Sequence, residues 1–542
     1  MKTKLFYISV ITLLSFPTLN FAQAPVLGTA ADFVLFSSVG AVTNTGVSQI
    51  TGNVGTNSGS STGFGNVNGQ MHDNDGVSAQ CSTDLLIAYN QLNATTPTQL
   101  HAPALGNGEV LVAGVYDVPA ASSLSLDLFL DAQNNPNAVF IFLVNGPLST
   151  GANSKVKLMN GALACNIYWK VEGLVSMSPG TTMRGTVIAN NAAISMTAGD
   201  TLIGRALSTN GAVTMTNLRG GTPVAGCETP LTGPTAPVLG TAACFAIFSS
   251  NGTISNSGTT FVTGDIGTNS GAVTGYNASN VTGTIHPNPD AVTAQCAADV
   301  AVAYNYLNAL QYDIELLYPA QFGNDLVLTP HTYLLDAATV FSDTLYLNAQ
   351  GNASAVFVIK VNGAFSSALN AKVILTNGAQ SKNVYWQVEG AVLLDDSTAF
   401  AGTLICNNGA LGAINTGVYF DGRALTTTGA LTTTAVTVVA TAIPGNCSTA
   451  TGVNSTAETS EAVTIYPNPF STTTTIKLND ASQINSYQIS IFNVLGEEVM
   501  RTSLTSSATT ISTSTLTTGM YFYKIIDKTG NTIQSGRMIA QQ

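Results

Sequence analysis

The sequence is short of charge. Only 8% of its 542 residues are charged, whereas an average soluble domain has roughly one quarter. The 17 basic residues are outnumbered by 29 acidic residues, which gives a formal net charge of −12. Nucleic-acid binding and electrostatic docking on anionic membranes both need a basic surface. The composition therefore excludes both of these partners.

Long apolar runs are scarce as well, and the one credible candidate lies at the N-terminus. Lys2 and Lys4 precede a short apolar stretch from Leu5 to Leu14, and Ala22-Gln23-Ala24 offers small residues for cleavage. The stretch is too short for a transmembrane helix, which needs about 20 apolar residues. We interpret residues 1–22 as a secretory signal peptide. The mature chain is predicted to be exported and to lack a membrane span.

Motifs for catalysis and metal binding are missing too. The seven cysteines form no C-x-x-C pair, and no H-E-x-x-H, G-x-S-x-G, phosphate-loop or dinucleotide motif occurs. His72 and His286 precede matching helices in the two halves of the chain, where a loop or capping hydrogen bond is the expected role. Asp395 and Asp396 are neighbours, and adjacent strand residues point to opposite faces. We predict no enzyme activity, no metal and no cofactor.

What the sequence does contain is a tandem repeat of about 210 residues. Ala24–Ala31 returns as Ala236–Ala243, and the offset between the copies grows only from 212 to 218 along the chain. The predicted organisation is two homologous domains joined by a Thr/Pro/Gly-rich linker, then a Ser/Thr-rich linker and a third region of different composition. In order, these segments are 24–228, 229–235, 236–447, 448–461 and 462–542.

Each copy contains one convincing helix, and the remainder of the copy is typical of short strands separated by Gly, Asn and Ser. The two helices carry apolar residues at the same spacings of four, four, three and four, which predicts one buried stripe each. Cys81 and Cys296 belong to these stripes, so buried thiols are expected there. Because export permits disulfides, Cys244 and Cys406, which occur only in the second copy, are a possible pair. The stripes are Val77, Cys81, Leu85, Ala88 and Leu92, and Val292, Cys296, Val300, Ala303 and Leu307.

A finer repeat lies inside the first copy. Val175–Ser178, Ile194–Thr197 and Val213–Thr216 follow one another at intervals of 19 residues. A period near 20 with strand alternation predicts a β-solenoid, in which each coil stacks on its predecessor. Alternation sends Val, Ile and Met inward and hydroxyl side chains outward. Two outward columns are predicted, namely Ser176, Ser195 and Thr214, and Ser178, Thr197 and Thr216.

Residues 462–542 have more charge and the alternation of a small antiparallel β-sandwich. Four ordered blocks, Ile465–Phe470, Ile491–Glu497, Leu516–Tyr521 and Gly536–Ile539, resemble the C-terminal sorting domain of the type IX secretion system. The resemblance implies contact with the secretion machinery through residues 462–542. Release from the cell, or attachment to the outer cell surface, is then expected.

Both long copies carry a further set of short blocks. Domain 2 keeps most of them, but it has Cys244 where domain 1 has Asp32 and Lys382 where domain 1 has Cys165. In domain 1 the blocks are Val26–Phe33, Thr51–Gly55, Ala88–Asn90, Gly114–Tyr116, Leu130–Gln133, Asn137–Phe142, Ala164–Trp169 and Gly204–Leu207.

These blocks resemble the microbial ice-binding protein family. The resemblance implies a mainly β fold, with two right-handed discontinuous β-solenoids that each have a long flanking helix. It also implies that ice is the partner and that a Thr-rich face of the solenoid binds it. We assign this face to the two outward columns, extended by Thr150 and Asn153, with Thr432 and Thr434 as the second-domain counterparts.

Domain 1 is expected to bind ice more strongly than domain 2. Leu393 and Asp395 occupy the positions of Ser176 and Ser178, and a carboxylate holds its hydration water too tightly for a match to ice. The alternative hypothesis is a cell-surface adhesin or matrix protein, whose solenoids are spacers or bind glycans.

Overall fold

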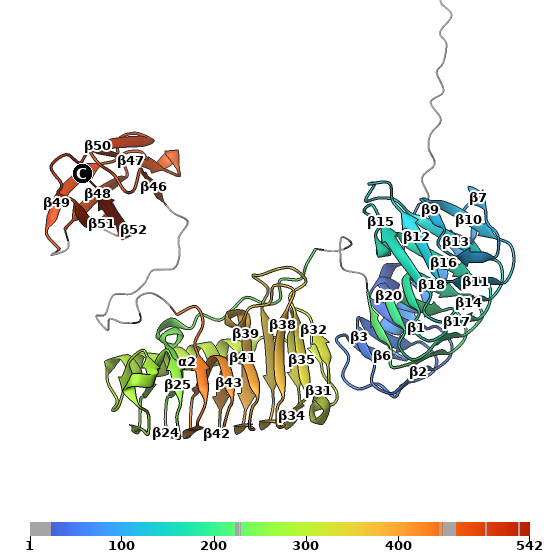
Figure 1. Cartoon of the computed structure of the whole chain (residues 1–542), viewed down its shortest axis with the longest axis horizontal. Coiled ribbons are helices and arrows are strands. Elements are labelled where there is room, and N and C mark those ends of the chain that lie inside the picture. The colour runs from blue at the N-terminus through green and yellow to red at the C-terminus, as the bar shows by residue number, and fades with distance from the viewer. Residues whose placement is uncertain are drawn as a thin grey trace, which may run out of the picture. The chain divides into compact units, whose positions relative to one another are not determined.

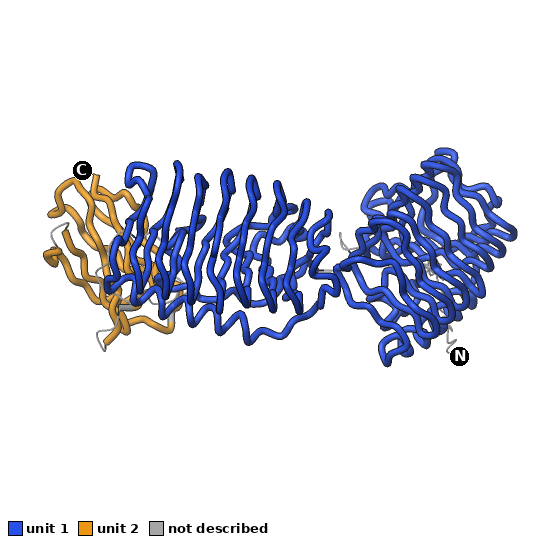
Figure 2. The backbone as a smooth tube through the Cα atoms, turned by 90° about the horizontal axis from the view of Figure 1, so that it is seen from below, with its two compact units in different colours: residues 1–449 blue, residues 450–542 orange. Residues whose placement is uncertain are grey.

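The computed structural model describes residues 23–222, 227, 229–443, 447, 462–493, 496–528 and 532–541. The predicted signal peptide and the linker 448–461 lie outside the described residues. The chain divides into two compact units, residues 1–449 and 450–542 (Figure 2). The larger unit contains two parallel β-solenoids, here called the first solenoid (28–221) and the second solenoid (240–439), and the smaller unit is antiparallel (Figure 1).

One side of the first solenoid is an eight-stranded parallel sheet, which we call the hydroxyl face. Its strands alternate between buried apolar and more exposed small polar residues, as expected for one coil stacked on the next. In spatial order the strands are β5 (Ser61–Thr62), β2 (Val42–Thr45), β21 (Val213–Thr216), β19 (Ile194–Met196), β17 (Val175–Ser176), β14 (Leu148–Thr150), β11 (Ser122–Ser125) and β8 (Ala104–Gly106).

The other two sides belong to one bent 14-stranded sheet. Helix α1 (Gly76–Asn93) covers one side, and the uncovered side is called the third face. The strands beside the helix are β6 (Met71–Asp73), β4 (Asn53–Thr56), β1 (Phe33–Ser37), β20 (Thr201–Ser208), β18 (Thr182–Ala189), β16 (Ile167–Val171), β13 (Phe140–Val144), β10 (Gly114–Val118) and β7 (Gln99–Leu100). The third face adds β9 (Val110–Val112), β12 (Asp127–Asp131), β15 (Lys155–Met159), β22 (Arg219–Gly221) and β3 (Gln49–Thr51), with the first halves of β18 and β20.

The second solenoid repeats this plan, with α2 (Ala291–Ala309) as its helix. The eight-stranded sheet is β27 (Val273–Thr274), β24 (Ile254–Ser257), β44 (Leu431–Thr434), β42 (Leu411–Ile414), β40 (Val392–Leu394), β37 (Phe365–Ser367), β34 (Thr339–Ser342) and β31 (Phe322–Gly323). The helix side has β29 (Ile285–His286), β26 (Asp265–Thr268), β23 (Phe245–Ser249), β43 (Tyr419–Thr426), β41 (Ala399–Asn407), β39 (Val384–Glu389), β36 (Phe357–Val361), β33 (Thr332–Leu335) and β30 (Ile314–Glu315). The third face has β28 (Val281–Thr282), β25 (Phe261–Thr263), β45 (Thr437–Val439), β38 (Lys372–Thr376), β35 (Thr344–Asn348) and β32 (Leu326–Leu328).

Stacked apolar columns fill each solenoid. Trp169 is fully buried and stacks on Phe142 at a ring distance of 4.0 Å. Where the bent sheet turns its corner, the coils approach so closely that a Cβ on Gly204 would lie 1.9 Å from the Gly185 carbonyl oxygen. Only glycine fits such a contact. The corner glycines therefore allow the bend between the third face and the helix side.

Both helices dock through the predicted stripes. Cys81 and Cys296 are fully buried, and α1 packs on Phe33 and its neighbours in the adjacent sheet. Val77 departs from the prediction because it lies in the first helical turn and is 39% exposed. Each helix begins at an aspartate that accepts from a backbone N–H three residues later, which completes a capping box with Ser78 or Thr293.

The coils do not stack in the order of the chain. Strands β1 and β2, near the N-terminus, pair with β20 and β21, close to the end of the first solenoid. The helix separates these first coils from the later ones in sequence. The discontinuity implied by the family resemblance is therefore present in the structure.

Each solenoid forms one disulfide with a cysteine that lies beyond its last strand. They join Cys165 to Cys227 and Cys244 to Cys447, and Cys406 is a buried free thiol. The predicted Cys244–Cys406 pair is wrong. Cys406 points into the core, where its Sγ contacts the carbonyl oxygen of Gly390 at 2.9 Å.

The smaller unit consists of two antiparallel sheets around one apolar core, as predicted. The strands of the smaller unit are β46 (Val463–Tyr466), β47 (Thr473–Leu478) and β50 (Ala508–Ser512) in one sheet, and β49 (Glu498–Ser503), β48 (Tyr487–Phe492), β51 (Gly519–Asp527) and β52 (Thr532–Ala540) in the other.

Two short 3-10 turns of the solenoids, η1 (Gly28–Ala31) and η3 (Gly240–Cys244), contact α1 and α2 respectively. The remaining 3-10 turns are η2 (Ala164–Asn166), η4 (Ala278–Asn280), η5 (Pro319–Gln321), η6 (Ser381–Asn383) and η7 (Ala481–Gln483).

Removing the first disulfide should destabilise the first solenoid. Cys165 and Cys227 are 62 residues apart, and closing a loop of that length contributes about 2–4 kcal/mol by restricting the unfolded chain. The double variant Cys165→Ser/Cys227→Ser should unfold at a lower temperature in calorimetry. Reductant should lower the first-solenoid transition of the wild type to that of the double variant. If reductant left the unfolding temperature of the wild-type first solenoid unchanged, this assignment would be contradicted.

The second solenoid should lose stability as pH rises above neutrality. The Asp265 carboxylate, 3.9 Å from the ring Nε2, is the main cause that raises the pKa of His286, and Asp290, 2.6 Å from its Nδ1, adds to the effect. Because the folded-state pKa is raised, the stabilisation is complete below about pH 6.5, the unfolded value, and disappears as pH rises through the folded pKa. Thermal unfolding from about pH 6 to pH 8.5 measures this loss.

The first solenoid offers the matched control. Asn53 stands where the second solenoid has Asp265, and each side chain accepts from the corresponding backbone N–H, that of Gln70 or Thr284. Asp265→Asn should therefore keep the loop hydrogen bond and remove most of the pH dependence. An unchanged pH profile in this variant would refute the role of the carboxylate.

Candidate functional site

The first outward column runs across all eight strands of the hydroxyl face. Backbone pairing aligns Ser176 with Ser195 and Ser195 with Thr214, as the 19-residue repeat predicted. The column then continues in both directions beyond the predicted coils. Its members, in spatial order, are Thr62, Thr43, Thr214, Ser195, Ser176, Ser149, Ser123 and Ala104.

A second, shorter column lies two residues further along the coils. Thr45 pairs directly with Thr216. Thr197 and Ser178 follow the ends of β19 and β17, and the Thr197 hydroxyl donates to the Met177 carbonyl oxygen at 2.9 Å. All four side chains are exposed or half-buried. The two columns together form a grid of hydroxyl groups.

Most of the grid is free to bind water. Among the described residues, the hydroxyls of Thr43, Ser176, Ser195 and Thr214 have no protein hydrogen-bond partner, whereas Ser149 Oγ makes a long contact of 3.3 Å to the Ser122 carbonyl oxygen. Coils in a parallel sheet lie about 4.7–4.9 Å apart, and alternate residues of a strand about 6.6–6.8 Å apart. The hydroxyls of the two columns therefore repeat at regular intervals in two directions.

The hydroxyl face has no charged residue in any of its eight strands. The third face of the same solenoid does carry charge, including the Lys157–Asp127 pair at 2.8 Å and the exposed Lys155 and Arg219. The remaining side is covered by α1. Of the three sides, one therefore combines exposure with the absence of charge.

Thr150 and Asn153, which were predicted to extend the outward columns, do not lie in them. Thr150 is buried, because it lies one residue past the outward Ser149, and its hydroxyl contacts Thr181 Oγ1 at 2.7 Å. Its assignment to the outer face is wrong. Asn153 is exposed but lies in a turn beyond β14, with a positive φ of 60°. It stands at the edge of the grid and not in a column.

Prediction from the sequence missed the hydroxyl residues of the early coils. Thr43, Thr45 and Thr62 belong to β2 and β5, which pair with the distant β21 or with each other. Their signal was the alternation Val42-Thr43-Asn44-Thr45, which matches Val213-Thr214-Met215-Thr216. The 19-residue period does not reach them because α1 and several coils intervene.

The second solenoid has a weaker version of the grid. Thr432 pairs with Ser255, which pairs with Thr274, so a short hydroxyl column exists there. Its hydroxyls bond one another: Ser255 Oγ lies 3.4 Å from Thr432 Oγ1, and Ser257 Oγ lies 3.1 Å from Thr434 Oγ1. Fewer of them are therefore free to organise water.

Further along the same sheet the column becomes apolar and irregular. Leu393 and Val340 are 42% and 40% exposed at positions that hold Ser176 and Ser123 in the first solenoid. The pairing of β40 with β42 has a register shift, because Val392 pairs with Leu411 whereas the next residue, Leu393, pairs with Ala413. Asp395 follows β40 in a turn, where it accepts from the backbone N–H of Asp396. The hydroxyl column is therefore not continuous across this sheet.

The two histidines that precede the helices, and the buried Trp386, have structural contacts. His72 Nδ1 and His286 Nδ1 lie 2.7 and 2.6 Å from the helix-capping Asp75 and Asp290. Trp386 is buried, and its indole N–H donates to the Ala401 carbonyl oxygen. No cluster of three or more His, Cys, Asp or Glu side chains able to hold a metal ion occurs in the described part of the chain. None of the described helices is long and apolar enough to cross a membrane.

Two family models match the chain. One, described as ice-binding-like, matches residues 36–219 and 248–439, and the other, described as a secretion system C-terminal sorting domain, matches residues 464–539. The crystal structure of an ice-binding protein from an Antarctic Flavobacteriaceae bacterium is 57% identical, with a TM-score of 0.76. That alignment covers 78% of this chain and 99% of the other.

Curated relatives are similar over shorter stretches. An ice-binding protein of Nostoc sp. (strain HG1) is 38% identical over 31% of this chain and 63% of its own length. Ice-binding protein 1 of Shewanella frigidimarina (strain NCIMB 400) is 40% identical over 20% of this chain and 13% of its own length. The chain thus spans less than two thirds of either relative.

Proposed function

The chain belongs to the ice-binding-like family, and on this basis we propose that it is an ice-binding (antifreeze) protein that adsorbs to ice through the hydroxyl face of the first solenoid. Adsorption inhibits the growth or recrystallisation of ice. The observation that carries the proposal is the uncharged, two-dimensional grid of hydroxyls, most of which have no protein hydrogen-bond partner among the described residues. Ser176, Ser178, Ser195, Thr197, Thr214 and Thr216 are its central members, and Thr43, Thr45, Thr62, Ser123 and Ser149 extend it.

Physical chemistry connects such a grid to ice. The spacings of the coils and of alternate residues are close to repeat distances on ice surfaces. Threonine has few χ1 rotamers, so its methyl and hydroxyl groups stay in nearly fixed positions. A charged group would instead hold a strong hydration shell of its own. A neutral, regular surface can order water in the pattern that the ligand itself has.

We assign the weaker role to the second solenoid. Thr432 and Thr434 remain its candidate contacts, but their hydroxyls are engaged with Ser255 and Ser257. Exposed Leu393 and Val340 and the register shift at β42 leave no continuous grid. The second solenoid is proposed to support adsorption and not to dominate it.

The same proposal covers the rest of the chain. Residues 1–22 would be removed as a signal peptide, and residues 462–542 direct secretion, so the protein is secreted or held on the outer cell surface. No catalytic role is proposed, since the relatives above are ice-binding proteins and Asp395 serves a turn. Ice is the partner, and no cofactor is required.

Replacing hydroxyl residues by a bulky ring should remove activity without unfolding the protein. In Ser195→Tyr/Thr214→Tyr the rings would hold ice away from neighbouring hydroxyls, and thermal hysteresis should fall by more than half. Stability should change by less than about 0.5 kcal/mol, as expected for surface substitutions. Calorimetry checks the fold, and nanolitre osmometry the activity.

Two matched variants make this test specific. Thr201→Tyr places the same ring on the third face and should leave thermal hysteresis intact. Thr432→Tyr lies on the corresponding sheet of the second solenoid and should cost less than Thr214→Tyr. If Thr432→Tyr has the larger effect, the ranking of the two solenoids is wrong, and if Thr201→Tyr does, the ice-binding face is wrong.

The adhesin hypothesis makes a different prediction. During slow directional freezing, an ice-binding protein should enter the growing ice phase, whereas a spacer or glycan-binding protein should stay in the liquid. The measured quantity is the fraction of secreted protein recovered from washed ice, with the Ser195→Tyr/Thr214→Tyr variant as the control. Equal exclusion of both proteins from ice would favour the adhesin.

A further inference from the structure

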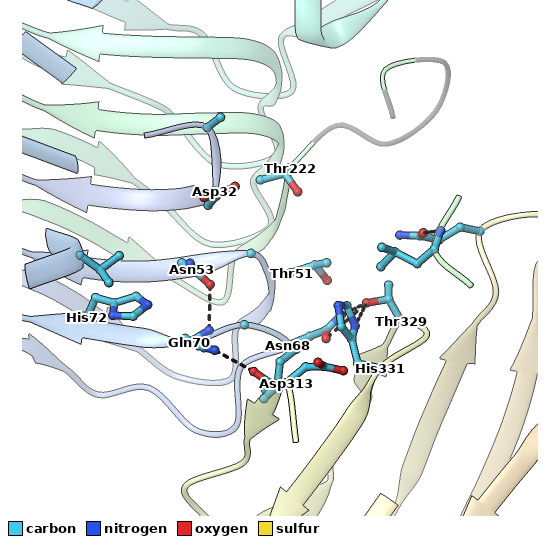
Figure 3. Close-up of a pocket in the computed structure, with 17 residues that line it drawn as sticks. Asp32, Thr51, Asn53, Asn68, Gln70, His72, Thr222, Asp313, Thr329 and His331 are labelled. Atoms are coloured by element: carbon cyan, nitrogen blue, oxygen red, sulfur yellow. Dashed lines mark hydrogen bonds between the residues drawn. The ribbon is translucent and has the colours of Figure 1, made fainter. Parts of the chain in front are cut away.

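At one end of the stack of coils in the first solenoid, the edge of the outermost coil meets the second solenoid. Three polar side chains at alternate positions, Asn66, Asn68 and Gln70, project from this edge. Asn66 exchanges two hydrogen bonds with the backbone of Tyr318, each 2.9 Å long. Gln70 Nε2 donates to the Asp313 carbonyl oxygen at 2.7 Å (Figure 3). These contacts lie within the compact unit formed by residues 1–449.

The central contact is buried. Asn68 Nδ2 donates to Thr329 Oγ1 at 3.0 Å, and the Tyr333 hydroxyl lies 2.7 Å from Asn68 Oδ1 (Figure 3 shows Asn68 and Thr329). Asn68, Thr329 and Tyr333 are only 3%, 4% and 0% exposed. Separating the solenoids would remove the partners of the Asn68 amide, and a buried amide without partners is costly. From these contacts we propose that the two solenoids are fastened end to end and move as one body.

The side chains of this junction are particular to it. At the opposite end of the second solenoid, Thr282 stands at the position of Asn68 and is exposed. At the opposite end of the first solenoid, Val112 stands at the position of Thr329, and the Tyr116 hydroxyl donates to its carbonyl oxygen. Neither free end therefore has the side chains needed to repeat the contact. The contact is therefore specific to this pair of solenoid ends.

A local insertion supplies another part of the junction. The offset between equivalent residues of the two copies is 215 at Gln99 and Ile314, which pair with Tyr116 and Tyr333, and 217 at the later strands β8 and β31. The two additional residues fall in the segment that contains Tyr318. Its backbone N–H and carbonyl oxygen are the groups that Asn66 bonds. The second copy thus differs from the first where it meets Asn66.

The linker is fastened to the second solenoid as well. Leu231 N donates to Gln350 Oε1 at 3.1 Å, and the Leu231 carbonyl oxygen accepts from Asn352 Nδ2 at 3.0 Å. Val356 N donates to the carbonyl oxygen of Thr232 at 2.9 Å. These bonds hold Leu231 and Thr232 against the second solenoid.

A fixed junction has a consequence for adsorption, and this consequence rests on the proposed function. When the hydroxyl face of the first solenoid adsorbs to ice, a fastened second solenoid is held at a fixed position beside it. The adsorbed body is then larger, and a second, weaker contact needs no further loss of orientational freedom. Loosening the junction should lower thermal hysteresis although no residue of either face has changed.

The test measures the distance between the solenoids in the full mature chain. Spin labels at Lys155→Cys and Lys372→Cys, both exposed positions on the third faces, report that distance by pulsed electron resonance. The parent protein should give one narrow distribution, and Asn68→Ala should broaden it severalfold. Thr329→Val is the second junction variant. The equivalent position of the first solenoid already holds a valine, Val112, so the coil should fold with this side chain. Thr282→Ala and Val112→Thr, the equivalent changes at the free ends, should leave the distribution narrow.

The outcomes separate the junction from the ice proposal. A broad distribution in the parent protein, or a narrow one in both junction variants with the fold intact by circular dichroism, would overturn the junction. A distribution that broadens while thermal hysteresis stays unchanged would keep the junction and remove its role in adsorption. If Ser195→Tyr/Thr214→Tyr also left hysteresis unchanged, the proposed ice-binding face would fail while the junction stood.

Discussion

Parallel backbone hydrogen bonding between coils is the constraint on which the other features depend. A parallel ladder places each residue directly beside its partner in the next coil, so a side-chain type that recurs in register becomes a column. The apolar columns form the cores, and the column from Thr62 to Ser123 forms the hydroxyl face. The same pairing requires that strands and corners keep their lengths, because one extra residue would move every following side chain to the other side of the sheet. At β42 of the second solenoid such an irregularity occurs, and there the hydroxyl column ends.

The sequence was sufficient for features that repeat within a short distance along the chain. The 19-residue period predicted the pairing of Ser176, Ser195 and Thr214, and helical spacing predicted the burial of Cys81 and Cys296. It failed where neighbours in space are remote in sequence. Thr43 lies beside Thr214 only because the first coils stack on the last, and Cys244 finds Cys447 across 203 residues. Thr150 was misassigned for a local reason, since composition marks a residue as polar but only strand register decides whether it points outward.

The two solenoids show how one scaffold permits different surfaces. Their inward columns are mostly apolar because each coil must fill the space left by its neighbours, and the inward Thr150 hydroxyl is paired with that of Thr181. Outward positions have no such restriction, and the second solenoid has Leu393 and Val340 where the first has serines. Ends of solenoids are restricted in another way, because an uncovered coil leaves backbone groups and side chains to solvent or to a partner. Asn68 with Thr329 and Tyr333 is one solution, and the exposed Thr282 and Val112 at the free ends are another.

The scarcity of charge is not explained by folding. Outward positions of the third face belong to the same coils as the hydroxyl face, and they accept Asp127, Lys155, Lys157 and Arg219 without disturbing the stack. Solubility would also be served by charge at exposed positions. The eight strands of the hydroxyl face nevertheless contain none, and several of their hydroxyls have no protein partner among the described residues. Since neither the core nor solubility demands this, the requirement must come from what the face contacts. A ligand made of ordered water is one that fixed charges would disturb and that regularly spaced neutral hydroxyls can match.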